Sequence, residues 1–505
     1  MNAKRLLSML LCLLMVVSAF ALVACEETTS TESTASEGGD TEESNNTSDA
    51  VDFDSLMPEF TWSGAEYETF DVLVVSQEGE ATYYCEDVVP NAYSTTDASL
   101  SEAVGKRNDE ILKKYGVTIV AHPVKDVRAD LKEDITSNLL QYDAALMFMP
   151  AAASLAQEGY LWDLNEFSEY LHFDQPWWDQ SATESLSIGG KLFFNTGDIS
   201  IMPKIVSTAI TFNKEILKKN FPETDLYQMV KDRKWTFDKM IEMSRTVTAD
   251  SDGTSGMTYH DNWGLSASYG DVAGFYIGAG KNYITKDSDD LPIISINDTS
   301  SVTTLQKILE ALQLKDDWCF HCNTVTDGSN IWVVSLDVFG QNRALFRTSA
   351  FSAIKKLRAY DDAQEFGIVP YPMVNEEQDQ YYTYCAAKYA YAAVIPTSLQ
   401  GTDAEYAAFM LEAMAYGGRK YITPAYYETT LKYRDLRDDE SGEMLDLVFS
   451  NVVYDLGIIY EFGGVSNMIQ DMMKDNSTDV ASTFESKRDS IQDAIDTCVE
   501  SYGIE

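Results

Sequence analysis

"TFDVLVVSQ", residues 69–77, is a short apolar run rich in β-branched residues, which is typical of a buried strand. Asp97 or Ser99 can cap a helix after this run, and Gly116 ends that helix. The predicted elements continue in alternation: a helix over 95–116, a strand over 117–122, a helix over 126–140, a strand over 142–149 and a helix over 151–158. Such an alternation, with mostly apolar strands, predicts a parallel α/β sheet.

A second α/β unit is predicted from Lys191 onward. Its elements are extended segments over 189–200, 204–213 and 291–297 and helices over 213–221, 235–247 and 300–315. Thr236 is the expected cap of the middle helix. Extended segments return over 365–372 and 388–396, and after Pro396 the chain is predicted to be mostly helical.

The amino-terminal residues have the pattern of a cleaved export signal. A basic start, Lys4 and Arg5, precedes an almost unbroken apolar run over 6–24, which closes on small residues before Cys25. The tetrapeptide "LVAC" is similar to the lipobox of bacterial lipoproteins, in which the cysteine thiol carries a diacylglycerol and becomes the new N-terminus. We therefore expect 1–24 to be a lipoprotein signal peptide and Cys25 a lipid anchor. A retained membrane helix is the alternative, because a run of about 19 residues is near the lower limit for spanning a bilayer.

Residues 25–50 form an acidic segment rich in Ser and Thr, with no basic residue. This segment cannot bury enough apolar surface to offset its ordering entropy, so we expect a disordered tether between a membrane and a folded body. The whole chain has 37 Lys and Arg against 81 Asp and Glu, and a net charge of −44. That balance argues against binding nucleic acid or an anionic lipid surface, and it is typical of a soluble extracellular protein.

Seven cysteines are present, and the signal and the lipid would account for Cys12 and Cys25. The remaining five are Cys85, Cys319, Cys322, Cys385 and Cys498. An odd and sparse set in a large body does not indicate a disulfide framework. Cys319 and Cys322 have CxxC spacing, but a zinc site needs four ligands and no second Cys/His pair lies nearby in the sequence. We expect buried or free thiols, with a local disulfide or a metal as alternatives.

The sequence carries no recognisable catalytic motif. Its four histidines, His122, His172, His260 and His321, have no metal-binding helical spacing, and there is no HExxH, P-loop or G-x-S-x-G elbow. We therefore expect a protein that is not an enzyme. A surface glycoside hydrolase is the alternative of a different class, since a chain with so many acids always permits a pair of carboxylates at catalytic separation.

Seven stretches, in order after the "LVAC" tetrapeptide, resemble the extracellular solute-binding lipoproteins of bacterial ABC importers. They are "RNDEILKKYGVTI" (107–119), "QPWWDQSATESLSIGGKLFFNTGDIS" (175–200), "TFNKEILKKN" (211–220), "RKWTFDKMIEMSR" (233–245), "FGIVPYP" (366–372), "AAVIPTS" (392–398) and "PAYYETTLKYRD" (424–435). The resemblance is to the carbohydrate-type, family 1-like members of Gram-positive bacteria.

The resemblance implies a two-lobed periplasmic-binding-protein-like α/β fold, type II-like, with an interlobe cleft and a helical C-terminal region. We place the first lobe at 51–203, completed by about 336–396, and the second at 204–335, completed by about 397–505. It also implies a ligand clasped between lobes, a permease as partner, and a location on the outer face of the cell membrane. We expect a monomer.

A heavy supply of aromatic residues, with 8 Trp and 29 Tyr, suits sugar recognition, because flat rings lie against pyranose faces while polar groups bind hydroxyls. The candidate ligand contacts are Trp177, Trp178, Asp198, Trp263, Tyr269, Tyr276 and Trp332. Pro176 favours an extended lead-in, which sends Trp177 and Trp178 to opposite sides. We predict that one ring packs the first lobe and the other faces the cleft. Tyr389 and Tyr391 are expected to line the core or the hinge.

The family often carries a calcium-loop-like segment after the helix that corresponds to 236–248. Asp250, Asp252 and Asp261 occupy positions one, three and twelve of such a loop here. Thr254 replaces a third acid, and Ser255 replaces the glycine of the sharp turn. We expect a plain acidic turn and no cofactor, with bound calcium as the alternative.

The expected function is capture of a sugar or oligosaccharide and its delivery to an ABC permease. The nearer alternative is a binding protein for a peptide or another polar solute.

Overall fold

The computed structural model describes residues 53–56, 58–59, 67–75, 87–90, 98–313, 317–357, 360, 365–427 and 439–504. All of them belong to one compact unit, Phe53–Glu505. The predicted signal peptide, Cys25 and the predicted tether lie outside the described residues, as does Cys85. No helix within the described residues is apolar over a length that would cross a bilayer.

The first sheet has four strands in the order β12-β3-β1-β2. They are β1 (Thr69–Val75), β2 (Thr118–Val124), β3 (Ala144–Phe148) and β12 (Tyr391–Val394). The middle strand β1 runs parallel to β2 and β3, which confirms the predicted parallel sheet, and β12 joins β3 in antiparallel orientation. Phe70, Val72 and Leu73 of β1 are fully buried, as its apolar sequence requires.

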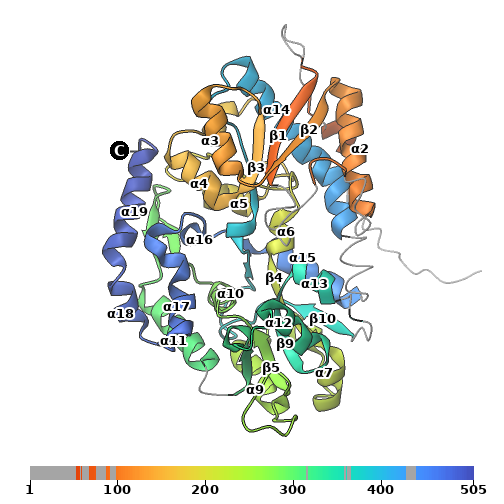
Figure 1. Ribbon diagram of the computed structural model, residues 1–505, viewed down its shortest axis with the longest axis vertical. Coiled ribbons are helices and arrows are strands. Elements are labelled where there is room, and N and C mark those ends of the chain that lie inside the picture. The colour runs from red at the N-terminus through yellow and green to blue at the C-terminus, as the bar shows by residue number, and fades with distance from the viewer. Residues whose placement is uncertain are drawn as a thin grey trace, which may run out of the picture. The chain divides into compact units, whose positions relative to one another are not determined.

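Helices connect and cover these strands (Figure 1). They are α2 (Ala98–Tyr115), α3 (Val127–Ser137), α4 (Met149–Gln157) and α14 (Thr402–Gly417). Asp126 caps α3 by accepting a hydrogen bond from the Ala129 N–H at 3.0 Å, and Asn138 ends it in the left-handed conformation. We call this sheet and its helices the first lobe. The short α5 (Gln180–Leu186) and α6 (Met202–Val206) follow in the chain.

The second sheet has five strands in the order β10-β4-β9-β5-β8. They are β4 (Thr208–Asn213), β5 (Trp263–Ala267), β8 (Cys319–His321), β9 (Ala344–Ala350) and β10 (Phe366–Val369). β5 runs parallel to β8 and β9, whereas β4 is antiparallel to β9 and β10. Every residue of β4 is buried, including the polar Thr208, Thr211 and Asn213. Hydrogen bonds satisfy these polar groups, as where Thr211 Oγ1 donates to the Arg347 carbonyl at 3.1 Å.

The helices of this second lobe are α7 (Lys214–Asn220), α8 (Leu226–Lys231), α9 (Phe237–Val247), α10 (Val272–Gly278), α11 (Thr299–Leu312), α12 (Ile331–Gly340) and α13 (Phe351–Leu357). The predicted cap of α9 is confirmed, because Thr236 Oγ1 accepts from the Lys239 N–H at 3.3 Å. A small hairpin pairs β6 (Ile284–Lys286) with β7 (Pro292–Ile294).

The C-terminal region is helical, as predicted. Its elements are α15 (Asp439–Ser450), β13 (Val452–Val453), α16 (Leu456–Ile459), α17 (Met468–Lys474), α18 (Val480–Glu485) and α19 (Arg488–Ser501). Within the second lobe, α15 packs against β10, α17 against α10 and α18 against α11. This region therefore covers the second lobe more than the first.

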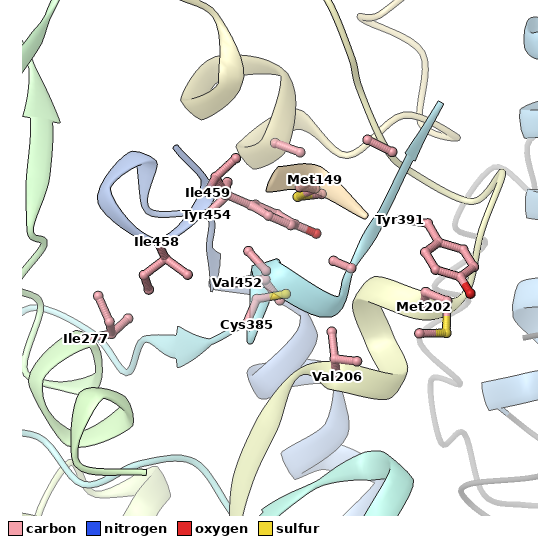
Figure 2. Packing of buried hydrophobic residues seen from close by; sticks show 14 of the residues in the cluster. Met149, Met202, Val206, Ile277, Cys385, Tyr391, Val452, Tyr454, Ile458 and Ile459 are labelled. Carbon is pink, nitrogen blue, oxygen red and sulfur yellow. The ribbon is translucent and has the colours of Figure 1, made fainter. Parts of the chain in front are cut away.

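The chain passes between the lobes through adjacent extended segments, which we call the crossover: 206–208, 383–387 and 451–454. Ser207 pairs with Cys385, and Thr208 Oγ1 donates to the Tyr384 carbonyl at 2.9 Å. The third segment adds β13, which pairs with β11 (Thr383–Tyr384). Figure 2 shows buried side chains of these segments, Val206, Cys385, Val452 and Tyr454, and of neighbouring elements, such as Met149.

The predicted exchange of segments between the lobes is wrong in two places. β9 and β10 lie within 336–396, which we expected to complete the first lobe, but both belong to the second sheet. α14 lies within 397–505, which we expected to complete the second lobe, but it packs against α2. An apolar strand pattern reports burial and not the pairing partner, and β9 and β12 are equally buried.

Two local predictions also change. The first three residues of the strand expected over 204–213 belong to the helix α6, which has Pro203 in its first turn, where a proline costs no hydrogen bond. The extended run over 189–200 forms isolated bridges and not a strand, such as the pairing of Asn195 with Ala393.

Candidate functional site

Three parallel strands of the second sheet end at one edge. β5, β8 and β9 close on Ala267, His321 and Ala350, and we call this line the carboxyl edge. β4 runs the opposite way, so its first residue, Thr208, lies opposite Ala350. The crossover therefore reaches the second sheet at the carboxyl edge. Ligands of open α/β sheets bind outside the carboxyl ends of the strands, which makes this edge the candidate site.

Asp271 ties the loop after β5 to the strand β9 at this edge. Its Oδ2 accepts hydrogen bonds from the Ser268 N–H at 2.6 Å and from Thr348 Oγ1 at 2.7 Å. The next turn is fixed by Asn323, whose Oδ1 accepts from the Tyr269 N–H at 2.7 Å. Asp271, Tyr269 and Asn323 are all partly exposed. A carboxylate, an amide and a phenol ring are thus presented side by side after β5 and β8.

Arg347 lies on β9 beneath the same edge. The guanidinium donates from Nε to the Ser335 carbonyl at 3.4 Å, and from Nη1 to the Thr348 carbonyl at 2.9 Å and Ser349 Oγ at 2.8 Å. Only 7 % of the residue is exposed. Burial lowers the pKa of Arg347, and the negative charge of Asp271 opposes that shift. Arg347 and Asp271 therefore influence one another electrostatically at the edge.

Trp332 stands at the start of α12. This helix ends at Gly340, directly before β9 begins, so its first turn lies at the carboxyl edge, beside the short 3₁₀ helix Cys322–Thr324. Asn330 caps the helix by accepting from the N–H groups of Trp332 and Val333. Trp332 is 57 % exposed, which is unusual for a residue whose large ring is normally buried. An exposed aromatic ring therefore flanks the polar groups of the edge.

Aromatic side chains of the crossover complete the surroundings. Tyr384 is partly exposed; burial raises its pKa, and the charges of Asp271 and Tyr389 add to that rise. Tyr389 is also partly exposed, and its ring meets the edge of Phe148 at a centroid separation of 6.4 Å. Tyr391 is buried, as expected for a core residue. The first lobe thus contributes Tyr389 and Phe148 near groups of the second.

The two adjacent tryptophans are both buried, at 2 % exposure for Trp177 and 3 % for Trp178. The indole of Trp178 donates to Glu412 Oε2 of α14 at 2.7 Å, and the ring of Trp177 meets Tyr416 of the same helix edge-on at 5.5 Å. Both rings therefore pack against α14, and the structure does not bring either one to the carboxyl edge. A ligand contact from one of them stays a prediction.

Three other predicted residues are also engaged in packing. Asp198 is buried and accepts from Lys204 Nζ at 2.9 Å, Thr423 Oγ1 at 2.7 Å and Arg419 Nη1 at 3.4 Å. Trp263 begins β5 at the opposite end of the strand from the carboxyl edge and lines a cavity of ≈ 440 Å³.

Tyr276 is fully buried in α10 and donates to the Asn282 carbonyl at 3.2 Å. Of the predicted contacts, the structure thus brings together Tyr269 and Trp332, both at the carboxyl edge.

The acidic turn brings its three predicted carboxylates together. Oxygens of Asp250, Asp252 and Asp261 lie within 4.8 Å of one another. Asp261 is buried and accepts from the N–H groups of Ser251, Asp252 and Thr258, so both of its oxygens are occupied. Burial alone would raise the pKa of Asp261, but these N–H donors outweigh burial and lower it. Backbone groups thus already neutralise the deepest acid, and calcium binding here stays a prediction.

The four described cysteines, Cys319, Cys322, Cys385 and Cys498, are buried free thiols. Burial raises the pKa of Cys322 to about 12, and the charge of Asp271 adds to this rise. Such a thiol stays protonated at neutral pH. The CxxC segment comprises the whole of β8 and the first residue of the 3₁₀ helix that follows it.

Sequence reasoning missed Asp271, Asn323, Arg347 and Tyr384. A usable signal existed for the first two, because both follow buried strands of a sheet, where carboxyl ends meet. It did not exist for Arg347, since its neighbours on β4 and β5 come from segments more than 70 positions away.

Residues 91–315 match the model of the family described as bacterial extracellular solute-binding protein. No curated protein sequence matches the chain. Among solved structures, a cyclo/maltodextrin-binding protein complexed with maltotetraose is similar at 14% identity and a TM-score of 0.54, over 87% of this chain and 98% of that chain.

Two further solved proteins share the fold. A solute-binding protein of an ABC transporter from Thermotoga lettingae, bound with α-D-tagatose, has 12% identity and a TM-score of 0.51, over 85% of this chain and 100% of that chain. UgpB from Mycobacterium tuberculosis, in complex with glycerophosphocholine, has 14% identity and a TM-score of 0.53, over 86% of this chain and 99% of that chain. The fold is thus shared with known solute-binding proteins, and residues 91–315 are similar to the family of bacterial extracellular solute-binding proteins.

Proposed function

We propose that this protein captures a sugar or oligosaccharide at the carboxyl edge of the second sheet and delivers it to the permease of an ABC transporter. The observation that carries the proposal is the exposed Trp332 beside a cluster of fixed polar groups, Asp271, Asn323 and Arg347. Sugar recognition requires this combination, because a ring covers the C–H face of a pyranose while planar polar groups bind its hydroxyls.

The crossover supplies a means of enclosing the ligand. A few extended segments can absorb the backbone changes of a hinge, and they meet the second sheet at the carboxyl edge itself. Closing the first lobe onto the edge would bring Tyr389 and Phe148 toward a ligand already held by the second lobe. The closed form then presents a surface that a permease distinguishes from the open form.

The ligands bound by the similar structures support the sugar class. Two of the three similar structures hold a sugar, maltotetraose or tagatose, and the third holds glycerophosphocholine. A polar solute that is not a sugar is therefore the second candidate. We expect no catalytic turnover, because family members of this kind bind and release their ligand.

We further propose that the protein is held outside the cell by a lipid on Cys25 and acts as a monomer. The tetrapeptide before Cys25 and the acidic segment over 25–50 support this arrangement. Mass spectrometry of the protein from its native membrane should find a diacylglycerol on Cys25 and no residue before it. An intact amino terminus would contradict the anchor.

A thermal-shift panel tests the ligand class. Oligosaccharides, peptides and glycerophosphodiesters are added in turn, and a ligand at about 100 times its dissociation constant adds roughly 2.7 kcal/mol to the free energy of unfolding. We expect only sugars to raise the melting temperature. Stabilisation by a peptide or a phosphodiester alone would overturn the sugar class, and steady release of reducing sugar at low protein concentration would overturn the binding role.

A further inference from the structure

Arg347 is a buried cation with unused hydrogen-bonding capacity. A guanidinium has five N–H donors, and Nε and Nη1 are engaged by the Ser335 carbonyl, the Thr348 carbonyl and Ser349 Oγ. Nη2 donates to no group among the residues that the structure describes. Two N–H donors of one planar group are therefore left over at the carboxyl edge.

The charge of Arg347 is also uncompensated at short range. In the described part of the chain, no carboxylate lies within 4.0 Å of its nitrogens. Asp271 is the acid that affects it most, but the oxygen Oδ2 of Asp271 is already engaged by Ser268 and Thr348. Removing a cation from water is costly unless an anion pairs with it, so a buried Arg without an ion pair is uncommon.

Arg347 lies close to the carboxyl edge, where its two unused N–H donors could bind a ligand. It pairs with Ser266 on β5 and Thr211 on β4, so it lies in the centre of the second sheet, three positions before the carboxyl end of β9. Its neighbours Asp271, Cys322, Tyr360 and Tyr371 influence its pKa, and the first two follow the carboxyl ends of β5 and β8. We therefore assign the 7 % of Arg347 that stays exposed to the edge where we place the ligand.

We propose that the bound saccharide is acidic, and that Arg347 binds a uronate carboxylate through Nη2. This inference rests on the proposed sugar-binding function and refines it. A carboxylate matches the planar donor group and supplies the missing negative charge, whereas a hydroxyl supplies only an acceptor. Because the chain as a whole is strongly acidic, selection of an anionic ligand requires a local cation of this kind.

Matched pairs of probes test the proposal. Oligogalacturonate, oligoguluronate and oligoglucuronate are each compared with the same oligosaccharide after reduction of its carboxyl groups, by calorimetric titration of the folded protein. We expect at least one acid to bind ten or more times tighter than its reduced partner. The variant Arg347→Gln should abolish that preference, and Arg347→Lys, which keeps the charge, should retain part of it.

Arg343→Gln is the matched control. Arg343 directly precedes β9 at its other end and donates to Gln341 Oε1, so this variant removes the same charge far from the edge. It should leave the preference unchanged. Circular dichroism of each variant reports folding. If Arg347→Gln does not fold, the affinities of the native protein and of Arg347→Lys for the acid and the reduced oligosaccharide still test the proposal.

The outcomes separate the two proposals. If reduced oligosaccharides bind as well as the acids, or if Arg347→Gln keeps the preference, the acidic-ligand proposal is overturned while sugar binding stands. If no oligosaccharide of either kind binds, both proposals fail.

Discussion

The tryptophan pair of the first lobe and Trp332 of the second lobe have opposite surroundings. Trp177 and Trp178 are 2 % and 3 % exposed, and Trp178 is bonded to a buried glutamate on α14. Trp332 is 57 % exposed and stands beside polar groups at the end of a sheet, although the other tryptophans of its lobe, Trp235, Trp263 and Trp318, are buried. The same residue type therefore supports packing in both lobes and offers a surface at Trp332. Burial and bonding, and not residue identity, separate the two roles.

The first prediction removes a buried ring. Trp178→Ala should lower the free energy of unfolding by roughly 3–5 kcal/mol, because it leaves a cavity and removes a donor from Glu412. Urea unfolding followed by circular dichroism measures the change. Trp332→Ala serves as the control and should change stability by no more than about 0.5 kcal/mol. If Trp178→Ala were as stable as the native protein but bound sugar poorly, Trp178 would be a ligand contact and not a packing residue.

The second prediction concerns a buried acid that directly follows the crossover and caps α16. Asp455 accepts from the N–H groups of Tyr283 and Gly457, yet burial raises its pKa to about 7 from 3.8. The folded state therefore holds the proton more tightly than the unfolded state. The resulting stabilisation is complete below pH 3.8 and is lost as the pH rises through about 7.

Asp455→Asn stays neutral, so its free energy of unfolding should fall less than that of the native protein between these pH values, by roughly 2–4 kcal/mol. Urea unfolding at several pH values measures both proteins. If the free energies of unfolding of the two proteins changed in parallel with pH, Asp455 would have the same pKa in the folded and unfolded states, which would contradict the prediction.

The third prediction removes the exposed ring. Trp332→Ala should weaken sugar binding about tenfold, since an aromatic contact contributes roughly 1–2 kcal/mol, while the melting temperature of the free protein stays the same. Calorimetric titration with the best oligosaccharide measures the affinity. Val333→Ala alters the neighbouring exposed residue and should have a smaller effect. Unchanged affinity in Trp332→Ala would move the binding surface away from α12.

The smallest effect is expected at the acidic turn of the second lobe. Because Asp261 is already satisfied by three backbone N–H groups, millimolar calcium should not shift the melting temperature. Differential scanning calorimetry with calcium and with EDTA measures this. A rise that disappears in Asp250→Asn would establish a calcium site, and the turn would then join the exposed functional surfaces.

Sequence patterns predicted the elements better than their partners. The strand–helix alternation from Thr69 to Phe148 became the parallel sheet, because apolar periodicity reports burial directly. The lobe assignment of β9 and of α14 was wrong, because pairing across hundreds of positions leaves no local pattern. For the site, an aromatic residue is recognisable in the sequence, but its exposure depends on the neighbours. Trp332 and Trp178 illustrate this, since both lie next to apolar residues in sequence.

The position of β12 in the first sheet has a consequence for the order in which the chain is made. β3 pairs with β12 along one side, so this side of β3 is an open strand edge until residues 391–394 have emerged from the ribosome. α14, which packs against α2, is made later still. An open apolar edge invites association with other chains. The first sheet therefore lacks its edge strand β12 until all strands of the second sheet have been synthesised. A chaperone that binds extended chains would be needed most at this open edge of β3.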